Sequence, residues 1–250
     1  MKEVIIKTES LKKNYASDQG SVPVIHNLDF EIYRGEFTMI MGNSGSGKST
    51  LLYLLSGLDT VSGGKIWINE QTVQDKNESA LALMRRKHIG FVFQEHNLIP
   101  NLSLRENILV AGYLSAHNKK IVQQRTNFLL DELELRALAN RLPSQVSGGE
   151  QQRCAIARAL INVPTILMAD EPTGNLNSAA SEKALNCLKK INENGQTIVM
   201  VTHDLKAACY GDKVLFFKDG GMPGTFEFTK DQPQAERESS LFTWLKQMGW

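Results

Sequence analysis

Three short runs of apolar residues predict strands of a sheet that is buried on both faces. The runs cover residues 37–41, 165–169 and 197–202, and each is almost continuously hydrophobic. Strands of a parallel sheet have this composition because helices cover both faces of the sheet. Segments of helical character precede the last two runs, as expected where strands and helices alternate. The pattern therefore predicts an α/β fold with a parallel sheet in the middle.

The N-terminal part of the chain has a different pattern, which predicts additional strands. Residues 4–7 and 24–33 are expected strands around a polar turn at residues 17–21. Residues 65–68 form another expected strand after the Gly63-Gly64 turn. These segments predict a β-rich flank beside the parallel sheet.

Between residues 102 and 141 the spacing of apolar residues becomes helical. Residues 107–114 and 122–138 carry apolar side chains three and four positions apart. The leucines on or near one helical face are Leu129, Leu130, Leu133 and Leu138. The spacing predicts a helical insert in the α/β domain.

The C-terminal part contains a turn cluster at residues 219–224 and a polar stretch at residues 230–240 that is expected to be a linker. A short tail follows, and its apolar residues share one helical face. They are Leu241, Trp244, Leu245 and Met248. Such a face favours docking of the tail on the parent domain over a partner site.

Composition limits the function classes. The chain has 250 residues, 42% of them hydrophobic, and a net charge of +1, so no overall basic field favours nucleic acid. The only basic run, residues 85–87, is better explained as a solvated face. Cys154, Cys187 and Cys209 are widely spaced and form no C-x-x-C pair, which is typical of reduced thiols in a cytosolic protein. The N-terminus lacks a secretory signal, and no eighteen apolar residues are contiguous, so the chain is not expected to span a membrane.

Residues 42–49 fit the phosphate-binding pattern G-x-x-x-x-G-K-[ST] with no departure. The residues are Gly42, Asn43, Ser44, Gly45, Ser46, Gly47, Lys48 and Ser49, and Thr50 opens an expected helix over residues 50–58. Backbone amides of such a loop converge on phosphate oxygens at a helix N-terminus. Lys48 supplies a charge for the β- and γ-phosphates, and the Ser49 hydroxyl suits Mg²⁺. A chance match is expected in roughly one chain in a hundred of this length. We call residues 42–49 the phosphate loop.

Two adjacent carboxylates, Asp170 and Glu171, follow the apolar strand at residues 165–169. Consecutive side chains at a strand end point in different directions, so they can have different roles. Asp170 is placed to hold Mg²⁺, and Glu171 is placed to accept a proton from the water that attacks a γ-phosphate. The alternative is a pair of solvated acids at the end of a strand.

A second glycine-containing helix start lies at Ser147, Gly148 and Gly149, before a helical segment at residues 152–160. Amides at such an N-terminus can face an anion. By spacing alone an ordinary loop is the better interpretation. The order of the motifs instead favours an anion-binding role for these residues. They follow the phosphate loop and the helical insert, and they precede the Asp-Glu strand. We call residues 147–149 the signature segment.

With these motifs, residues 1–225 resemble the ATP-binding subunits of ABC transporters. The resemblance implies a P-loop NTPase (RecA-like) core with an antiparallel β subdomain and an inserted α-helical subdomain. It implies a nucleotide-binding domain at residues 1–226, an insert at about residues 95–160, and a linker and tail at residues 227–250. In that family two ATP molecules, with Mg²⁺, lie between the phosphate loop of one copy and the signature segment of the other, so a monomer carries half-sites.

The resemblance gives roles to three further residues. Gln94 is similar to the glutamine that senses Mg²⁺ and the attacking water, although by itself it would be an ordinary surface residue. His203 is similar to the histidine that contacts the γ-phosphate, although a lone histidine is more often structural. Tyr15 is similar to the aromatic residue on which adenine stacks, and a packing role is almost equally favoured. His26, His88 and His96 have no such context.

The stretch from residue 93 to residue 107 resembles a bacterial subgroup that includes lipoprotein-release, macrolide-export and bacitracin-type resistance systems. Residues 214–220 and the short tail most resemble its peptide-resistance branch. The family usually has aspartate at the position of Asn177, so the coupling between the two half-sites is expected to differ here.

The subgroup implies an integral membrane permease of the FtsX type as partner and a second ATP-binding subunit, identical or different, with a homodimer favoured. The chain is then expected on the inner face of the cell membrane, held through the permease, with Leu98, Ile99 and Leu102 as the contact patch. The alternatives are a soluble ABC-type ATPase acting on nucleic acid or ribosomes, and a regulatory module that holds ATP without hydrolysis. Paired domains or a coiled-coil insertion, typical of the first, are not visible, and Asp170-Glu171 argues against the second.

Overall fold

The computed structural model describes residues 2–17, 20–115, 118–229 and 231–250. The strands are β1 (Val4–Ser17), β2 (Gly20–Tyr33), β3 (Phe37–Met41), β4 (Gly63–Ile68), β5 (Gln71–Thr72), β6 (Ile89–Val92), β7 (Ile166–Asp170), β8 (Thr197–Thr202), β9 (Lys213–Lys218) and β10 (Gly221–Glu227). They form an antiparallel sheet in the order β2-β1-β4-β5 and a larger sheet in the order β10-β9-β3-β8-β7-β6. The larger sheet is parallel from β9 to β6, and β10 is antiparallel to β9.

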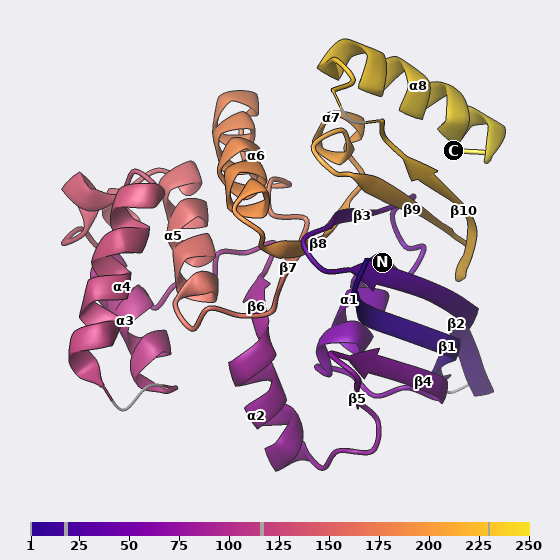
Figure 1. Ribbon diagram of the computed structural model, residues 1–250, viewed down its shortest axis with the longest axis horizontal. Helices are drawn as coiled ribbons and strands as arrows, with labels where there is room; N and C mark the ends of the chain where they lie inside the picture. Colours follow the sequence, from indigo (N-terminus) through magenta and orange to yellow (C-terminus); the bar gives the residue numbers. More distant parts are fainter. Residues whose placement is uncertain (1, 18–19, 116–117, 230) are drawn as a thin grey trace.

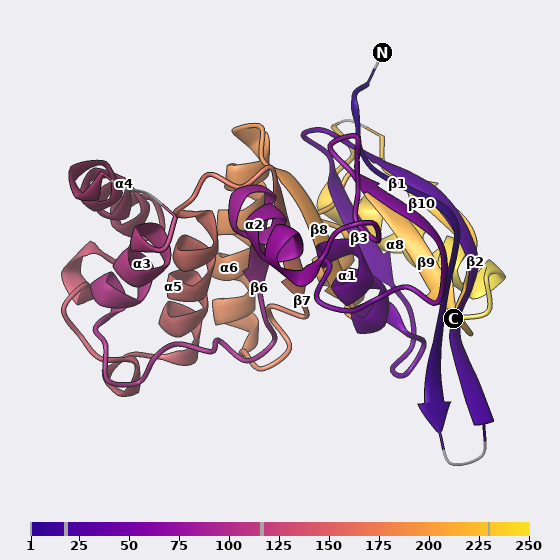
Figure 2. The ribbon, with the colours of Figure 1, turned by 90° about the horizontal axis from the view of Figure 1, so that it is seen from below.

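Helices cover both faces of the larger sheet. They are α1 (Lys48–Ser56), α2 (Glu78–His88), α3 (Leu104–Tyr113), α4 (Lys119–Glu132), α5 (Gly148–Leu160), α6 (Ser178–Glu193), α7 (Leu205–Ala208) and α8 (Gln234–Gln247), with short 3₁₀ helices η1 (Arg136–Leu138) and η2 (Pro143–Gln145). In both ribbon views α3, α4 and α5 lie at one end of the molecule and the antiparallel sheet lies at the other (Figures 1 and 2). The predicted parallel sheet, β-rich flank and helical insert are confirmed.

The parallel strands contribute to two hydrophobic clusters, one on each face of the sheet. In β7, Ile166 and Met168 join the cluster that contains α1, whereas Leu167 and Ala169 join the cluster that contains α5 and α6. Alternate residues of a strand point to opposite faces. Burial on both faces therefore explains the continuous apolar runs in the sequence.

Some predicted boundaries differ from those in the structure. The strand predicted at residues 4–7 continues to Ser17 because β1 stays paired with β2 up to Ser17 opposite Gly20, although the outer part is exposed. Ladder hydrogen bonds need no apolar side chain, so the hydrophobic pattern missed this extension. Of the turn predicted at residues 17–21, positions 18 and 19 lie outside the described residues.

The helix predicted from residue 50 instead begins at Lys48, because the last residues of the phosphate loop already form its first turn. The linker predicted at residues 230–240 is also partly wrong, because α8 begins at Gln234. The first two turns of α8 consist mainly of polar residues, so their sequence is similar to that of a linker. The predicted docking of the tail is confirmed, since Leu241 and Leu245 are fully buried and Trp244 packs against Phe216.

Candidate nucleotide site

The residues predicted to hold phosphate and Mg²⁺ at the phosphate loop and to act on the attacking water meet at the carboxyl edge of the larger sheet. The phosphate loop follows β3, Glu171 follows β7, His203 follows β8, and Gln94 follows β6 with one residue between. These strands are parallel neighbours, so their carboxyl ends share one edge. Ligands of open α/β sheets bind outside that edge.

The phosphate loop is held close to the sheet by its glycines. A Cβ atom on Gly42 would lie 2.0 Å from the carbonyl oxygen of Phe217 in β9, so a larger residue does not fit there. Gly45 and Gly47 have positive φ angles of 77° and 101°, which favour glycine. The loop thus curls directly into the N-terminus of α1.

Lys48 lies inside the loop that it belongs to. It is only 5% exposed, and its Nζ donates to the carbonyl oxygen of Asn43 over 2.8 Å. Burial lowers the pKa of the Lys48 ammonium, while the nearby carboxylates of Glu171 and Asp170 act in the opposite direction. The side chain is therefore a partly desolvated cation with spare hydrogen-bonding capacity, which suits a polyphosphate.

Ser49 and Asp170 are joined across the edge of the sheet. Ser49 Oγ donates to Asp170 Oδ1 over 2.9 Å, and Asp170 is 4% exposed. Burial raises the pKa of Asp170, although hydrogen bonds from Ser49 and Tyr53 oppose the rise. These two oxygen donors fit Mg²⁺, which prefers oxygen ligands. Among the described residues no group of three or more His, Cys, Asp and Glu could hold a metal alone, so phosphate oxygens and water would complete the shell.

Glu171, His203 and Gln94 converge beside this pair. His203 Nδ1 lies 2.9 Å from Glu171 Oε2. A Cβ atom on Gly174 would lie 3.4 Å from Gln94 Nε2 and 3.5 Å from Glu171 Oε2, so both side chains border the same glycine. Glu171 has a φ of 41°, a left-handed conformation that non-glycine residues adopt rarely and often at functional sites. The structure therefore brings together three residues from separate strand ends.

Tyr15 borders the phosphate loop from the antiparallel sheet. A pocket of about 300 Å³ is lined by Tyr15, Val24, Ser44, Gly45, Gly47, Lys48, Ser49, Thr50 and Glu171. Tyr15 is 40% exposed, so part of its side chain is open to a ligand. The sequence did not single out the two side chains that contact this ring, Lys13 and Asp59. Asp59 belongs to an ordinary-looking turn after α1, and only the fold brings it next to β1.

The signature segment does not join this pocket. Among the described residues that line the pocket, Ser147, Gly148 and Gly149 are absent. Ser147 caps α5 in a capping box with Glu150, and the two ribbon views place α5 and α1 in separate parts of the molecule (Figures 1 and 2). Backbone and side-chain hydrogen bonds from Ser147 lower the pKa of Glu150. One chain therefore holds the two predicted phosphate-binding elements apart.

Two other residues have structural roles. Asn177 caps α6, since its side chain accepts a hydrogen bond from the amide of Ala180 over 2.9 Å, and asparagine and aspartate are equally good N-caps. The presence of asparagine in place of the family's usual aspartate at position 177 is thus neutral for the helix.

His96 Nδ1 contacts Gln152 Oε1 on α5, a contact that the sequence did not predict.

Comparison with known proteins decides the family. The profile described as "ABC transporter" matches residues 25–174. The chain belongs to the ABC transporter family. It is an ATP-binding, ATP-hydrolysing subunit, and the predicted P-loop NTPase fold is confirmed by its similarity to solved ABC cassettes. ABC ATPases form dimers and pair with membrane permeases.

Relatives of this ABC protein come from bacteria and archaea. The lipoprotein-releasing system ATP-binding protein LolD of Aquifex aeolicus is 44% identical over 88% of this chain and 96% of that protein. The bacitracin export ATP-binding protein BceA of Halalkalibacterium halodurans is 40% identical over 86% of each chain. The dimeric post-hydrolysis structure of the cassette MJ0796 bound to ADP and Pi matches with a TM-score of 0.83 and 39% identity, covering 90% of this chain and 99% of the other. The predicted subgroup is confirmed, and the nucleic-acid alternative gains no support.

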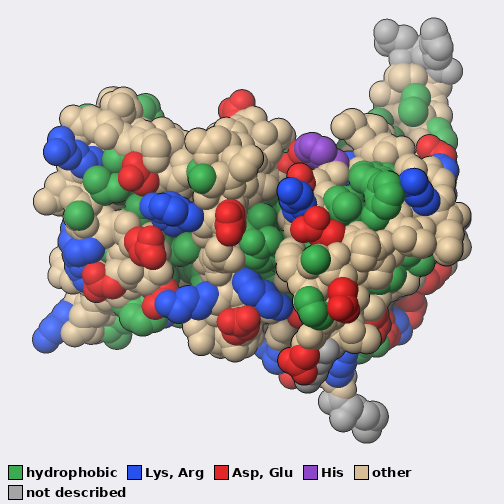
Figure 3. Space-filling view, turned by 90° about the horizontal axis from the view of Figure 1, so that it is seen from above, with side chains coloured by type: hydrophobic (Ala, Val, Ile, Leu, Met, Phe, Trp, Pro, Cys, Tyr) green, Lys and Arg blue, Asp and Glu red, His purple; other side chains and the backbone are tan. Residues whose placement is uncertain are grey.

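One face of the molecule carries charges of both signs. Lysine and arginine are interspersed with aspartate and glutamate on the face shown in Figure 3, so that face carries no extended basic patch. Within the described ranges, no helix has the length and apolarity needed to cross a membrane.

Proposed function

We propose that this ABC protein binds ATP with Mg²⁺ at a site shared by two copies, between the phosphate loop of one and the signature segment of the other. The observation that supports this most directly is the separation of the two elements in one chain. Each is a helix N-terminus suited to an anion, yet the pocket at the phosphate loop contains residues of only one of them. A second copy, taken to be identical, would supply the missing half.

Different residues around the phosphate loop bind the base, bind the phosphates, hold Mg²⁺ and act on the attacking water. Tyr15 stacks on the adenine, and the amides of the phosphate loop with Lys48 hold the phosphates. Ser49, Asp170 and Gln94 would hold Mg²⁺, which neutralises charge on the phosphate oxygens. Glu171 accepts the proton of the attacking water, and His203, 2.9 Å from Glu171, contacts the γ-phosphate. ATP closes the dimer, and hydrolysis reopens it.

Complementation between two inactive variants tests the shared site. Lys48→Ala removes the phosphate-loop charge, and Gly148→Asp places a negative charge where the signature segment would face phosphate. Asp is favourable in the first turn of a helix, and the nearest neighbour of a Cβ at Gly148 is 3.4 Å away, so the second variant should fold.

Each variant alone should be inactive, because both shared sites of its homodimer carry the defect. An equal mixture should regain about a quarter of wild-type ATPase activity, since half of the randomly formed dimers are mixed and each of these has one intact site and one doubly defective site. Phosphate release from the two purified variants, alone and mixed, measures this. A site completed within one chain would give no recovery on mixing.

We further propose that the partner is an FtsX-like permease, that the protein works on the inner face of the cell membrane, and that the system serves resistance to antimicrobial peptides or their export. The names of the relatives support this, since they include bacitracin export, macrolide export and lipoprotein-releasing systems.

A groove lies beside Gln94, lined by residues that include Phe91, Phe93 and Asn97. Near it, Ile99 is 43% exposed, whereas Leu98 and Leu102 are half-buried, so Ile99 is the part of the predicted patch best placed for contact.

Ile99→Asp should abolish stimulation of ATPase activity by the permease while basal activity stays unchanged. Phe242→Asp is the matched control, because Phe242 has a similar exposure of 40% and belongs to α8, remote from this groove. ATPase assays with the permease in detergent or vesicles compare the two variants. Equal stimulation of Ile99→Asp and wild type would reject this surface.

A further inference from the structure

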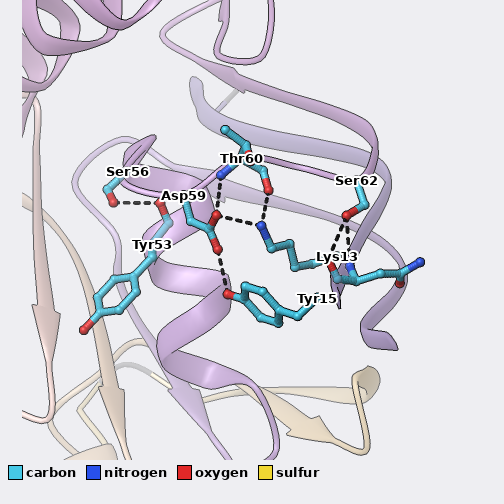
Figure 4. Close-up of polar contacts among 8 residues, drawn as sticks. Lys13, Tyr15, Tyr53, Ser56, Asp59, Thr60 and Ser62 are labelled. Carbon is cyan, nitrogen blue, oxygen red and sulfur yellow. Dashed lines mark hydrogen bonds and ion pairs between the residues drawn. The ribbon is translucent and has the colours of Figure 1, made fainter. Parts of the chain in front are cut away.

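The ring of Tyr15 is held in place by two side chains outside the nucleotide pocket. Its hydroxyl donates to Asp59 Oδ2 over 2.6 Å, and Lys13 Nζ lies 4.6 Å from the centre of the ring. Lys13 Nζ also donates to Asp59 Oδ1 over 2.6 Å. Figure 4 shows the three side chains joined around the Asp59 carboxylate. Both oxygens of that carboxylate are therefore in use.

The three residues come from two different layers of the molecule. Lys13 and Tyr15 lie two positions apart in β1, so their side chains point to the same side of the strand. Asp59 follows α1, the helix whose first residue is Lys48. Further hydrogen bonds join the same turn to β1, since Lys13 Nζ donates to the carbonyl oxygen of Thr60 and the amide of Asn14 donates to Ser62 Oγ. The contact thus fixes the antiparallel sheet against the helix that carries the phosphate loop.

The ionic pair inside this arrangement is well shielded. The Lys13 side chain is 6% exposed and the Asp59 side chain is 24% exposed. Burial alone would raise the pKa of Asp59, but hydrogen bonds from Lys13, Tyr15 and the Thr60 amide outweigh it and lower that pKa. A partly buried pair with these additional bonds is stiffer than an exposed ion pair.

The position of Lys13 also determines which face of the ring is available. Tyr15 lines the pocket at the phosphate loop, and Lys13 does not. The Lys13 ammonium lies over one face of the ring, so a flat, electron-rich base that stacks on Tyr15 would use the opposite face.

We propose that Asp59 and Lys13 are positioning residues that hold the Tyr15 ring as a base-stacking platform at a fixed distance from the phosphate loop. This inference rests on the proposed role of Tyr15 in binding adenine. It predicts that the Asp59–Tyr15 bond affects ligands that carry a base and leaves ligands without a base unaffected.

Asp59→Asn and Tyr15→Phe disrupt this bond from its two ends. An asparagine has one acceptor oxygen where Asp59 uses two, and it lacks the carboxylate charge that strengthens the bond from the Tyr15 hydroxyl, so that bond is lost or weakened. Phenylalanine keeps the ring and leaves the Lys13–Asp59 pair intact, which keeps the test valid if Asp59→Asn is unstable. Asp29→Asn is the control, because Asp29 is an exposed carboxylate of the same sheet whose contact is the amide of Ser10.

Calorimetry of the full chain with ADP and with pyrophosphate compares ligands with and without a base. Each single variant should weaken ADP binding about 5-fold, and the double variant should be no weaker than the weaker single one, because both remove one interaction. Pyrophosphate binding should change less than about twofold, and KM for ATP should rise while kcat stays within about twofold. The Asp29→Asn control should bind both ligands as wild type does.

The failures of the two ideas differ. If Asp59→Asn and Tyr15→Phe weaken ADP and pyrophosphate equally, or weaken neither, the positioning role is wrong. If Tyr15→Ala binds ADP as tightly as wild type, the stacking role of Tyr15 itself is wrong. A large loss in Tyr15→Ala with unchanged binding in the other two variants rejects positioning and leaves stacking intact.

Discussion

Two helix N-termini in this chain are suited to phosphate, and they are built differently. At α1 the phosphate loop curls around a lysine that is 5% exposed, and Asp170, Glu171 and Tyr15 surround it. At α5 the signature segment lies on the surface, and Ser147 shares a capping box with Glu150. The first N-terminus is enclosed by its own chain, and the second faces outward.

This difference explains how each half of the proposed shared site can be stable in a single copy, before two copies come together. The exposed end of α5 needs a cap because its first amides have no partner within the helix. Ser147 and Glu150 satisfy two of them, while Gly148, which is exposed, keeps the surface flat enough for another molecule to approach. The start of α1, by contrast, has no side-chain cap.

Glu171→Gln tests whether the enclosed end contains the chemistry. Turnover should fall about 100-fold or more, because the amide cannot accept a proton from water, while ATP binding is retained. The dimer should then remain closed in ATP and Mg²⁺, which size-exclusion chromatography detects. Glu182→Gln on the exposed surface of α6 makes the same charge change and should keep wild-type activity. Undiminished turnover in Glu171→Gln would remove Glu171 from the role of base.

A pair of glycine variants tests whether the signature segment has an inner and an outer residue. A Cβ on Gly149 would lie 2.8 Å from Cβ of Ala180, so Gly149→Ala should lower the free energy of unfolding by about 1–3 kcal/mol. A Cβ on Gly148 meets nothing closer than 3.4 Å, so Gly148→Ala should change stability by less than about 0.5 kcal/mol. Urea unfolding measures both.

The compensating variant is Gly149→Ala combined with Ala180→Gly, which restores space and should recover the stability lost through the clash. Gly148→Ala, although stable, should weaken ATP-induced dimerisation. If Gly148→Ala unfolds the chain and Gly149→Ala does not, the assignment of inner and outer residues is reversed.

Asp170→Asn tests the cost of burying the carboxylate that we propose as a ligand of Mg²⁺. Because burial raises the pKa of Asp170, its charged form destabilises the folded chain, fully at pH values above the folded-state pKa. Without nucleotide, Asp170→Asn should therefore raise the free energy of unfolding by about 1 kcal/mol at pH 7, and Mg²⁺-dependent turnover should be lost. The gain should shrink as the pH falls through the raised folded-state pKa, and it should disappear below 3.8, where the wild-type carboxyl becomes protonated in both states. Equal stability at pH 7 would contradict the burial argument.

Much of the fold could be predicted because its strands are buried on both faces. The run at Phe37–Met41 matches β3 residue for residue, since five consecutive buried positions leave no ambiguity. The outer half of β1 and the start of α8 could not be predicted. Their residues are exposed, and hydrogen bonding to a neighbour or packing of a few distant residues holds them in place.

The same reasoning applies to the site. Residues 42–49 and Asp170-Glu171 could be found from the sequence, because their chemistry depends on local spacing at strand ends. The grouping of Gln94, Glu171 and His203 needed the strand order, which only the family resemblance supplied. Asp59 was missed because no local pattern distinguishes an anchoring carboxylate from one that caps a turn.

The close approach of Gly42 to Phe217 has a consequence for how such loops are recognised. The first glycine of the pattern is required here by the neighbouring strand, since its missing side chain makes room for a carbonyl oxygen of β9. Glycine at this position of the motif is therefore required by the short distance between two strands and not by contact with phosphate. In a protein whose neighbouring strand lay slightly further away, a larger residue would fit at this position and the loop could bind the same ligand. A sequence search that requires glycine there would miss such a protein.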